Sequence, residues 1–419
     1  MGRPTLLWVP APVRPAVRVD LAAAVLYGLF GGLTLPFVAV MGRRLGASAL
    51  QVSLLVAAPA AVMLVSLGWV NLIRRAPAVR LVVWAHALGR AALLAMPLVH
   101  GPGAYVALVL LYHALASVGS LGYAQVVREA YPAEVRARIL GLVRVWMALA
   151  WVAAAAVGGR IMQAVPFQWV FAAAALVGVA SALVFSRIPL AAPHTVEPPV
   201  AVRAVPGLLR RDPAYRRFLA GFFVFGFGAW LAAPVVPILL VDRLRASAFQ
   251  VGLLGAVTSA AWVAAYVLWG RVLDRRPAPV VLVRIFLVGA LAPVVYLLAR
   301  NPWVVLVAGA ADGVASAGLD LGWLSAVLRH APPDQVRTYV AIYNTLLGIR
   351  GVAAPLLAAA LLPQVGTGPV LLAAVGLMGL GALVMRAAAR QARPDHPGGR
   401  LDPLHAASLQ WATRHAGEE

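Results

Sequence analysis

Three charged residues lie in the middle of long apolar segments, where ionised side chains are rare. Asp312 and Asp320 fall within the apolar segment 302–328, and Arg350 lies midway along segment 338–362. A charged side chain at the centre of a hydrocarbon layer costs roughly 2.5–3.5 kcal/mol unless it is paired or hydrated. We therefore expect Asp312 or Asp320 to pair with Arg350, in a site that binds substrate or exchanges a proton. A static pair that fixes helix register is the alternative.

The spacing of the two aspartates gives their depth. Asp312 lies about ten residues from the nearer end of its segment, which at about 1.5 Å per residue corresponds to the middle of a bilayer. Asp320 is two turns farther along the same segment and about 80° around the helix. The two carboxyl groups are therefore separate candidates for one partner.

Two polar residues in the first half of the chain are further candidates. Arg144 lies about six residues from the end of segment 138–159, so its long side chain can reach the membrane surface. We expect it to do so or to form a structural pair; contact with an anionic substrate is the other possibility. His113 lies near the middle of segment 103–127. It is expected to be a hydrogen-bonded packing residue, with a proton relay as the alternative.

Aromatic and amide residues are weaker candidates for a cavity wall. Tyr27 and Asn344 are of this kind, whereas His86 and Arg90 share one helix face and are expected to be structural. Segment 217–240 carries a cluster of aromatic residues and glycines: Phe222, Phe223, Phe225, Phe227 and Trp230 with Gly221, Gly226 and Gly228. A cavity wall for an apolar substrate is one interpretation of this cluster. The favoured one is packing against lipid, with the glycines at close helix contacts.

The composition requires a membrane protein. The chain has 419 residues, of which 62% are hydrophobic and 12% are charged. A soluble domain carries about 25% charged residues, because its surface faces water. The apolar residues come in blocks of roughly 20, the length that a helix needs to cross about 30 Å of hydrocarbon. These blocks are expected to be helices, since a membrane barrel would show alternation over about ten residues.

Charge and motifs exclude several function classes. The net charge is +21, and all 35 basic residues are arginines that gather at the ends of apolar blocks. This distribution indicates membrane topology and no nucleic-acid partner. The absence of cysteine excludes disulfides and thiolate metal sites. With no Walker motif, metal-ligand cluster or nucleophile–base arrangement in the sequence, we expect no enzyme, metal or cofactor.

Twelve spans are predicted, in two groups of six. The first group covers approximately 21–41, 49–71, 79–99, 103–127, 138–159 and 166–187. The second covers approximately 217–240, 248–270, 278–299, 302–328, 338–362 and 368–387. A proline-rich polar stretch between them is expected to be a linker. The predicted domains are an N-terminal six-helix bundle (1–187), a cytoplasmic linker (188–216), a C-terminal six-helix bundle (217–390) and a cytoplasmic tail (391–419).

The arginines predict the orientation of the spans. If both termini lie inside, 26 arginines fall on the inner side, 6 lie in the outer loops and 3 lie within spans. A ratio above four to one is a strong positive-inside signal. We therefore expect both termini in the cytoplasm and the chain in the inner cell membrane.

The two groups of spans resemble each other in sequence. The segment Leu45–Leu55 (LGASALQVSLL) matches Leu244–Leu254 (LRASAFQVGLL), each at the loop between the first and second spans of its half. Farther on, the first-half pattern Ala116-Ser117, Gly119 and Gly122-Tyr123 recurs as Ala315-Ser316, Gly318 and Gly322-Trp323. The matches keep one order and one spacing, which indicates duplication. A six-span repeat gives parallel halves, a transporter architecture with a site at the interface between the halves.

This organisation, together with one motif, resembles the major facilitator superfamily over essentially residues 15–390. That family carries Gly-x-x-x-Asp-Arg followed by basic residues, present here as Gly270, Asp274, Arg275 and Arg276. The resemblance implies an all-α fold of twelve transmembrane helices, in two six-helix bundles related by a pseudo-twofold axis. It also implies a conformational latch, in which Gly270 allows close helix approach and Asp274 forms ion pairs with arginines. A plain anchor of positive charge is the alternative.

The first-half copy of this motif departs from the family pattern. Gly68 and the trailing arginines are kept, but Leu72 stands where the family has the acid. Pro132 and Arg136 resemble the family's next cytoplasmic loop. The Gly-Pro motif of family antiporters is missing from the fifth span, so antiport is not supported.

We therefore expect a secondary active transporter that works by alternating access, with proton coupling as a possibility. The expected partners are the lipid bilayer, a small-molecule substrate and protons, and the chain is expected to be monomeric. Export of a drug-like, amphipathic compound and uptake of a metabolite are both open. A membrane sensor or partner-binding subunit that no longer transports is the alternative from another class.

Overall fold

The computed structural model describes residues 10–73, 78–189, 210–332 and 335–391. All regular elements within these ranges are helical. The N-terminal half consists of a short 3-10 turn η1 (Ala11–Val13), α1 (Arg14–Thr34), α2 (Val38–Arg44), α3 (Ala49–Ile73), α4 (Ala78–Ala92), the 3-10 segment η2 (Leu93–Leu98), α5 (Pro102–Ala130), α6 (Ala133–Ile161) and α7 (Phe167–Phe185).

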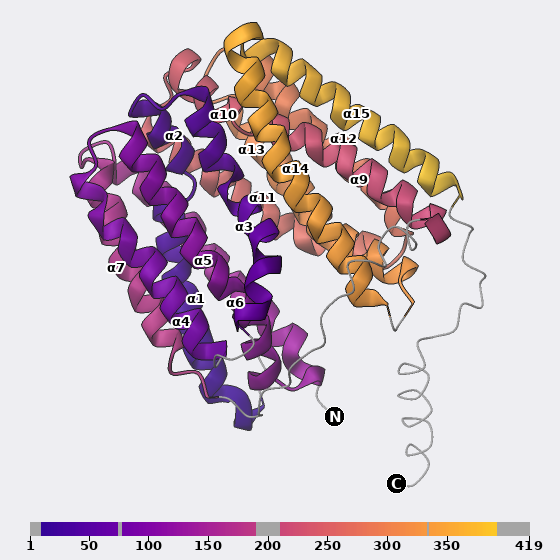
Figure 1. Cartoon of the computed structure of the whole chain (residues 1–419), viewed down its shortest axis with the longest axis horizontal. Coiled ribbons are helices and arrows are strands. Elements are labelled where there is room, and N and C mark those ends of the chain that lie inside the picture. The colour runs from indigo at the N-terminus through magenta and orange to yellow at the C-terminus, as the bar shows by residue number, and fades with distance from the viewer. Residues whose placement is uncertain (1–9, 74–77, 190–209, 333–334, 392–419) are drawn as a thin grey trace.

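The C-terminal half repeats this order. It consists of α9 (Pro213–Ala232), α10 (Val235–Ile238), the π-helical turn η4 (Leu239–Arg243), α11 (Ala248–Leu273), α12 (Ala278–Leu298), α13 (Val305–His330), α14 (Val336–Val365) and α15 (Thr367–Gln391). Figure 1 shows the two halves side by side, the N-terminal half in indigo to magenta and the C-terminal half in rose to yellow.

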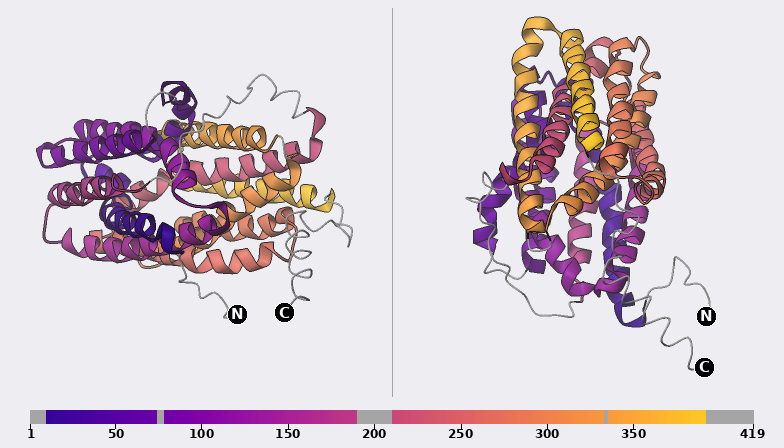
Figure 2. Two further views of the ribbon diagram at one scale, coloured as in Figure 1. Left: turned by 90° about the horizontal axis from the view of Figure 1, so that it is seen from below. Right: turned by 90° about the vertical axis from the view of Figure 1, so that its right-hand side faces the viewer.

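The helices occupy the positions of all twelve predicted spans, so the expected fold is confirmed. Nine helical stretches of the described residues are long and apolar enough to cross a membrane; the other three spans contain shorter apolar stretches, at Ala49–Ala61, Val82–Leu98 and Pro102–Ala116. In a hydrocarbon layer every backbone N–H and C=O must be paired within the chain, which favours long helices for such segments. The helices run alongside one another in both further views (Figure 2).

The first span of each half is not one continuous helix. The N-terminal half breaks between α1 and α2, around Pro36, and the C-terminal half breaks between α9 and α10, at Pro234. Proline lacks the N–H that continues a helix and clashes with the preceding turn. The end of the molecule that carries α2, α10 and η4 is called the far side below. The opposite end, where α7 ends and α9 begins, is called the linker side.

The internal repeat is visible in local geometry. Ser48 and Gln51 exchange hydrogen bonds between side chain and backbone at the start of α3, and Ser247 and Gln250 form the same capping box at the start of α11. Such a box satisfies N–H groups that the first turn leaves unpaired. Just before each box the backbone enters the left-handed region, at Gly46 (φ 89°) and Arg245 (φ 47°).

The two halves meet along two helix pairs. Helix α3 packs on α14, and α6 packs on α11. In Figure 1 the halves approach each other at the far side and diverge toward the linker side. At the α6–α11 contact the backbones nearly touch, because a Cβ on Gly159 would lie 3.1 Å from the Cα of Gly252.

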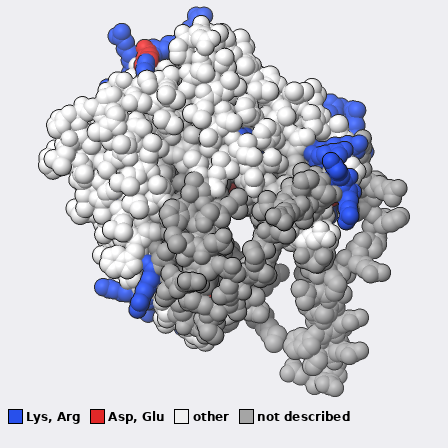
Figure 3. Space-filling model, in the orientation of Figure 1, with Lys and Arg blue, Asp and Glu red and all other residues white. Residues whose placement is uncertain are grey.

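The outer surface fits a lipid environment. Large apolar side chains such as Leu98, Trp169 and Leu298 are more than 60% exposed. Figure 3 shows arginines in patches toward the ends of the molecule, with a nearly uncharged surface between them. This is the surface that a hydrocarbon layer with polar boundaries requires.

Candidate functional site

Asp312 lies in the middle of α13, on the side of the helix that faces away from lipid. Val307, Leu324 and Leu328 mark the lipid-facing side, because they are large and apolar yet exposed. At about 100° per residue they lie roughly 120–160° around the helix from Asp312. The Asp312 side chain is itself exposed, and within the described ranges it has no ion-pair partner. It is an accessible carboxyl inside the membrane-spanning part of the protein.

The face of α13 that carries Asp312 also contacts α14. Trp323 lies three turns after Asp312 and only about 20° around the helix. Its ring stacks on Tyr343 of α14, with centroids 4.4 Å apart and planes 4° from parallel. The hydroxyl of Tyr343 in turn interacts with the guanidinium of Arg350. Polar and aromatic side chains thus connect the Asp312 face of α13 with Arg350.

Arg350 is buried between α14 and α9, with 6% of its surface exposed. Its Nη1 donates a hydrogen bond to the carbonyl oxygen of Phe222, and its Cζ lies 5.1 Å from the centre of the Phe222 ring. Gly226 makes room for it, because a Cβ at that position would overlap the guanidinium. The buried Nε of Arg350 has no hydrogen-bond acceptor.

The expected ion pair between Arg350 and an aspartate is wrong for this conformation. No ion pair joins Arg350 to Asp312 or Asp320, and the pair found between the two halves joins Arg43 to Asp242. Arg350 instead faces a backbone carbonyl, a phenol and an aromatic ring from its own half. Helix packing directs its side chain toward α9, and the spacing of charges along the chain carries no information on that direction.

Asp320 belongs to a separate group of residues closer to the linker side. Trp262 of α11 donates from Nε1 to Asp320 Oδ2 at 3.0 Å. Arg144 of α6 lies within electrostatic range of Asp320 and approaches the hydroxyl of Tyr266 on α11. Since α6 belongs to the N-terminal half, this group connects the two halves. Asp320 and Arg144 are candidates from the sequence, whereas Trp262 and Tyr266 are not.

His113 is half-buried on α5, and its ring contacts that of Tyr112 at a centroid distance of 4.8 Å. The internal repeat relates the position of His113 to a position in the other half. Ala116 corresponds to Ala315 in the duplication, and the same offset makes His113 the counterpart of Asp312. The two candidate proton carriers therefore occupy equivalent positions in the two halves.

Tyr27 lies on α1, in contact with a buried arginine. The guanidinium of Arg90 sits 4.9 Å from the Tyr27 ring centre and 5.5 Å from that of Phe30, and Arg90 donates to the carbonyl oxygen of Gly178 at 2.6 Å. These contacts join α4 to α1 and α7 within one half. They fit the structural role expected for Arg90 and make Tyr27 part of the same packing.

The aromatic cluster on α9 does not pack against lipid as expected. Phe222 and Phe225 are each 2% exposed, and Phe225 stacks on Phe286 of α12 with centroids 3.9 Å apart. The glycines do provide the expected close contacts, since Gly221 and Gly228 face α15. The error arose because an all-apolar helix gives no periodic signal of which side is buried.

Phe223 and Trp230 lie on another side of α9. Their positions differ by seven, which corresponds to about 20° around the helix, and both are half-buried. Trp230 lies beside Gly351, which in turn packs on Ala60 of α3 in the other half. This side of α9 therefore points toward the interface between the halves. Asn344 is exposed on α14.

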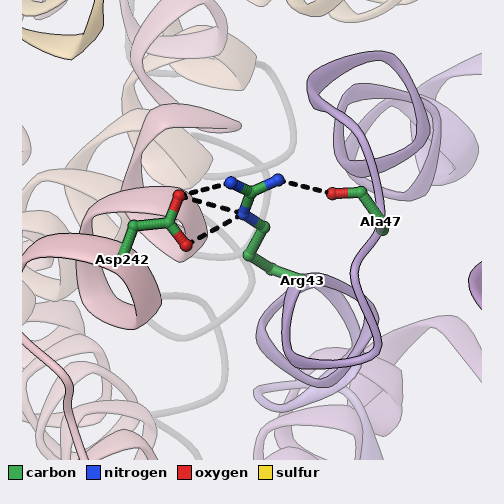
Figure 4. Close-up of polar contacts among 3 residues, drawn as sticks. All are labelled: Arg43, Ala47 and Asp242. Carbon is green, nitrogen blue, oxygen red and sulfur yellow. Dashed lines mark hydrogen bonds and ion pairs between the residues drawn. The ribbon is translucent and has the colours of Figure 1, made fainter.

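An ion pair closes the far side of the interface between the halves (Figure 4). Arg43 of α2 donates to both carboxylate oxygens of Asp242 in η4, and from Nη1 to the carbonyl oxygen of Ala47 at 2.7 Å. Next to it, Arg44 donates to the carbonyl oxygen of Ala246 at 2.5 Å. This pair was not predicted from the sequence, although the sequence contains a signal for it. Positions 43 and 242 are 199 residues apart, which is the repeat spacing, and carry opposite charges.

The residues of the expected latch form no ion pair among the described residues. Asp274, Arg275 and Arg276 are exposed at the end of α11. The expected close helix approach at Gly270 is wrong, because a Cβ there would meet nothing within 4 Å. The side chains around Gly68 in the other half lie outside the described residues.

Comparison with known proteins agrees with this architecture. The sequence profile of the Major Facilitator Superfamily matches twice, at residues 21–226 and 218–414. The chain belongs to the Major Facilitator Superfamily. The two matches correspond to the two halves of this superfamily protein.

Solved structures of transporters share the fold at low sequence identity. A mutant of the nucleoside transporter NupG has a TM-score of 0.69 and 13% identity, covering 89% of this chain and 99% of that one. A D-xylose–proton symporter has a TM-score of 0.66 and 13% identity, covering 92% and 99%. A bacterial homolog of the human lysosomal transporter Spinster, inward-facing and unoccupied, has a TM-score of 0.63 and 14% identity, covering 91% and 98%. No curated protein sequence matches the chain.

Proposed function

We propose that this superfamily transporter is coupled to protons and that Asp312 binds the coupling proton. The carboxyl lies in the middle of a spanning helix, faces away from lipid and has no ion-pair partner in the described part of the chain. An unpaired carboxylate is tolerated in such a place only while water reaches it, and it becomes neutral by taking up a proton when water is excluded. This observation carries the proposal.

Secondary transport of a small molecule follows from membership of the superfamily. In an alternating-access cycle the two halves move against each other around a site between them. Exposure of Asp312 first to one compartment and then to the other would couple proton movement to substrate movement. A solved D-xylose–proton symporter shares this fold, which supports the proposal of proton coupling.

We also propose that the protein is a monomer in the inner cell membrane. Its linker side then faces the cytoplasm. The arginine distribution supports this orientation, because basic residues favour the inner side. The far side, closed by Arg43 and Asp242, would then face outward. In this orientation the conformation described here is inward-facing.

Asp312→Asn tests the coupling. A thermal-shift panel of nucleosides, sugars, organic acids and lipophilic drugs first identifies a compound that stabilises the purified protein by mass action. That compound, radiolabelled, is then supplied to proteoliposomes with and without a pH gradient. We expect Asp312→Asn to abolish gradient-driven accumulation while exchange of labelled for unlabelled compound continues, because the neutral amide removes only the proton step.

Asp320→Asn is the matched control, since it removes a second carboxyl from the same helix. Asp320 is held by Trp262, and we expect this variant to keep gradient-driven accumulation. Normal accumulation by Asp312→Asn would contradict the assignment of the proton site. Failure of every compound to exchange in the wild-type protein would instead support a protein that senses and does not transport.

A further inference from the structure

Trp262 and Tyr266 lie on the face of α11 that points toward the other half. Val267 marks the lipid-facing side of this helix, because it is large and apolar yet 58% exposed, and the two rings lie roughly 100–140° around the helix from it. Both lie within about 20° of Gly255, where an added Cβ would be 2.8 Å from the Cβ of Pro36 in the N-terminal half. The two rings are half-buried, and their accessible surface therefore faces the interface between the halves.

The polar atoms of both rings are held by charged residues. Trp262 donates from Nε1 to Asp320 Oδ2 at 3.0 Å, and the hydroxyl of Tyr266 interacts with Arg144 of the other half. Asp320 and Arg144 are both exposed and lie within electrostatic range of each other, yet they form no ion pair. Each ring is thus fixed at its polar end, and the two charges beside the rings are opposite.

The faces of these rings are not used up by packing. The centroids of Trp262 and Tyr266 are 4.6 Å apart and the ring planes are tilted by 57°, so the rings form a corner. Trp323 and Tyr343 differ, because their planes are 4° from parallel and each ring covers a face of the other. Trp269 on the same helix also donates from Nε1, but only 7% of its surface is exposed. The corner is the arrangement that leaves ring faces accessible.

The corner lies along the proposed transport path. Its partner Asp320 is two turns farther along α13 than Asp312, toward the linker side. The two halves diverge toward that side in Figure 1. A solute that enters between the halves from the linker side meets the corner before it reaches the depth of the proposed proton site.

We infer that the corner of Trp262 and Tyr266 binds a neutral solute with a planar aromatic ring. Such a ring can stack on one face of the corner while its edge meets the other, and aromatic groups prefer these two arrangements. The opposite charges of Asp320 and Arg144 leave no excess charge that would select an ion. The inference rests on the proposed function, because the ring is taken to belong to the transported solute.

Three matched pairs of neutral probes test the inference. Each pair combines a planar aromatic compound with a saturated partner of similar size: benzamide with cyclohexanecarboxamide, naphthalene-2-carboxamide with its decahydro analogue, and uridine with dihydrouridine. The probes are added to the full chain in nanodiscs of phosphatidylcholine. We expect saturable binding, measured by calorimetry and thermal shift, for at least one planar compound and not for its saturated partner.

Trp262→Leu should weaken binding of the planar compound by about tenfold, the order expected for loss of one stacking ring. Tyr266→Phe should retain binding, because the ring remains. Trp169→Leu is the matched control, since it makes the same change at a lipid-facing ring that is 62% exposed, and it should bind normally. Three results would overturn the inference: no saturable binding by any planar compound, equal binding of the saturated partners, or normal binding by Trp262→Leu.

Ser316→Cys covers the case in which Trp262→Leu does not fold. Ser316 is half-buried one turn before Asp320 on α13, and the chain has no cysteine of its own. A saturating concentration of the planar compound should slow the reaction of this cysteine with N-ethylmaleimide, whereas the saturated partner should not. An unchanged reaction rate would also overturn the inference.

Two further variants separate this site from the proposed proton site. Asp312→Asn should bind the planar compound normally, so failure of proton coupling is distinguishable from failure of the corner. Asp320→Asn should also bind it normally, because Asp320 serves here only as an acceptor for Trp262 Nε1, and the amide oxygen of asparagine accepts the same hydrogen bond.

Discussion

At the scale of single residues, the charges within the membrane differ in how they are satisfied. Arg90 is enclosed by rings and a carbonyl, Arg350 retains an unpaired nitrogen, and Asp312 is exposed. All three were visible in the sequence as charges in apolar segments. Their depth followed from counting residues, since a helix rises by a constant distance per residue. Their partners did not follow, because the partners come from other helices.

The Arg43–Asp242 pair is the residue-level contact whose role can be tested most directly. The side chains of the two residues are 27% and 41% exposed, so the pair contributes little to folding, about 0.2–1 kcal/mol. The same free energy applied to a two-state equilibrium changes the population ratio by up to about fivefold. The pair is therefore better placed to bias the conformation than to stabilise the fold.

We predict that Arg43→Asp and Asp242→Arg each open the far side more often, and that the double variant R43D/D242R restores much of the closure. The single changes place like charges opposite each other, whereas the double change reverses the pair. Recovery should be incomplete, because Arg43 also donates to Ala47. Labelling of a single cysteine introduced near the far side of the interface measures the opening. If the increase in labelling of the double variant equalled the sum of the increases in the two single variants, a direct pair would be refuted.

At the scale of elements, small residues decide how closely the helices of the two halves approach. Gly159 of α6 faces Ala248, Phe249 and Gly252 at the start of α11. Without side chains at Gly159 and Gly252, backbone meets backbone, which is the usual basis of close contacts between helices in membranes. The contact lies next to the capping box of α11. The first turn of α11 is therefore part of the interface between the halves.

We predict that Gly159→Val separates α6 from α11 and destabilises the closed far side by about 1–3 kcal/mol, the usual cost of overpacking. The expected readouts are a lower melting temperature in detergent and greater accessibility of a far-side cysteine. Gly141→Val in the same helix is the control, because a Cβ at Gly141 would meet nothing within 4 Å. Equal effects of the two substitutions would mean that helix propensity, and not packing between the halves, is responsible.

At the scale of the whole molecule, the duplication gives two halves with the same fold but with different residues at equivalent positions. Equivalent positions carry His113 and Asp312 in the middle of the membrane, and Arg43 and Asp242 at the far side. The second pair joins equivalent positions directly, so it lies at the pseudo-twofold axis. Two identical copies would place like charges there. Divergence of the halves was therefore needed before this contact could form.

We predict that the two ends of the molecule face different compartments, with the linker side in the cytoplasm. The chain has no cysteine, so single cysteines can be introduced at exposed sites. Arg300→Cys, in the loop between α12 and α13, should react with a membrane-impermeant maleimide in intact cells. Ser186→Cys, at the end of α7, should react only after permeabilisation. The reverse pattern would overturn the orientation and with it the inward-facing assignment.

The sequence alone determined the number and order of the spans, the duplication and the family, because hydrocarbon thickness sets helix length and lipid forces backbone groups to pair within the chain. It also placed Asp312 at mid-depth. Only the tertiary structure decided that Arg350 turns toward Phe222 and away from both aspartates, and that Asp320 bonds Trp262. It likewise decided that Arg43 meets Asp242. These contacts depend on how each helix is rotated about its own axis, and uniformly apolar helices leave that rotation to packing.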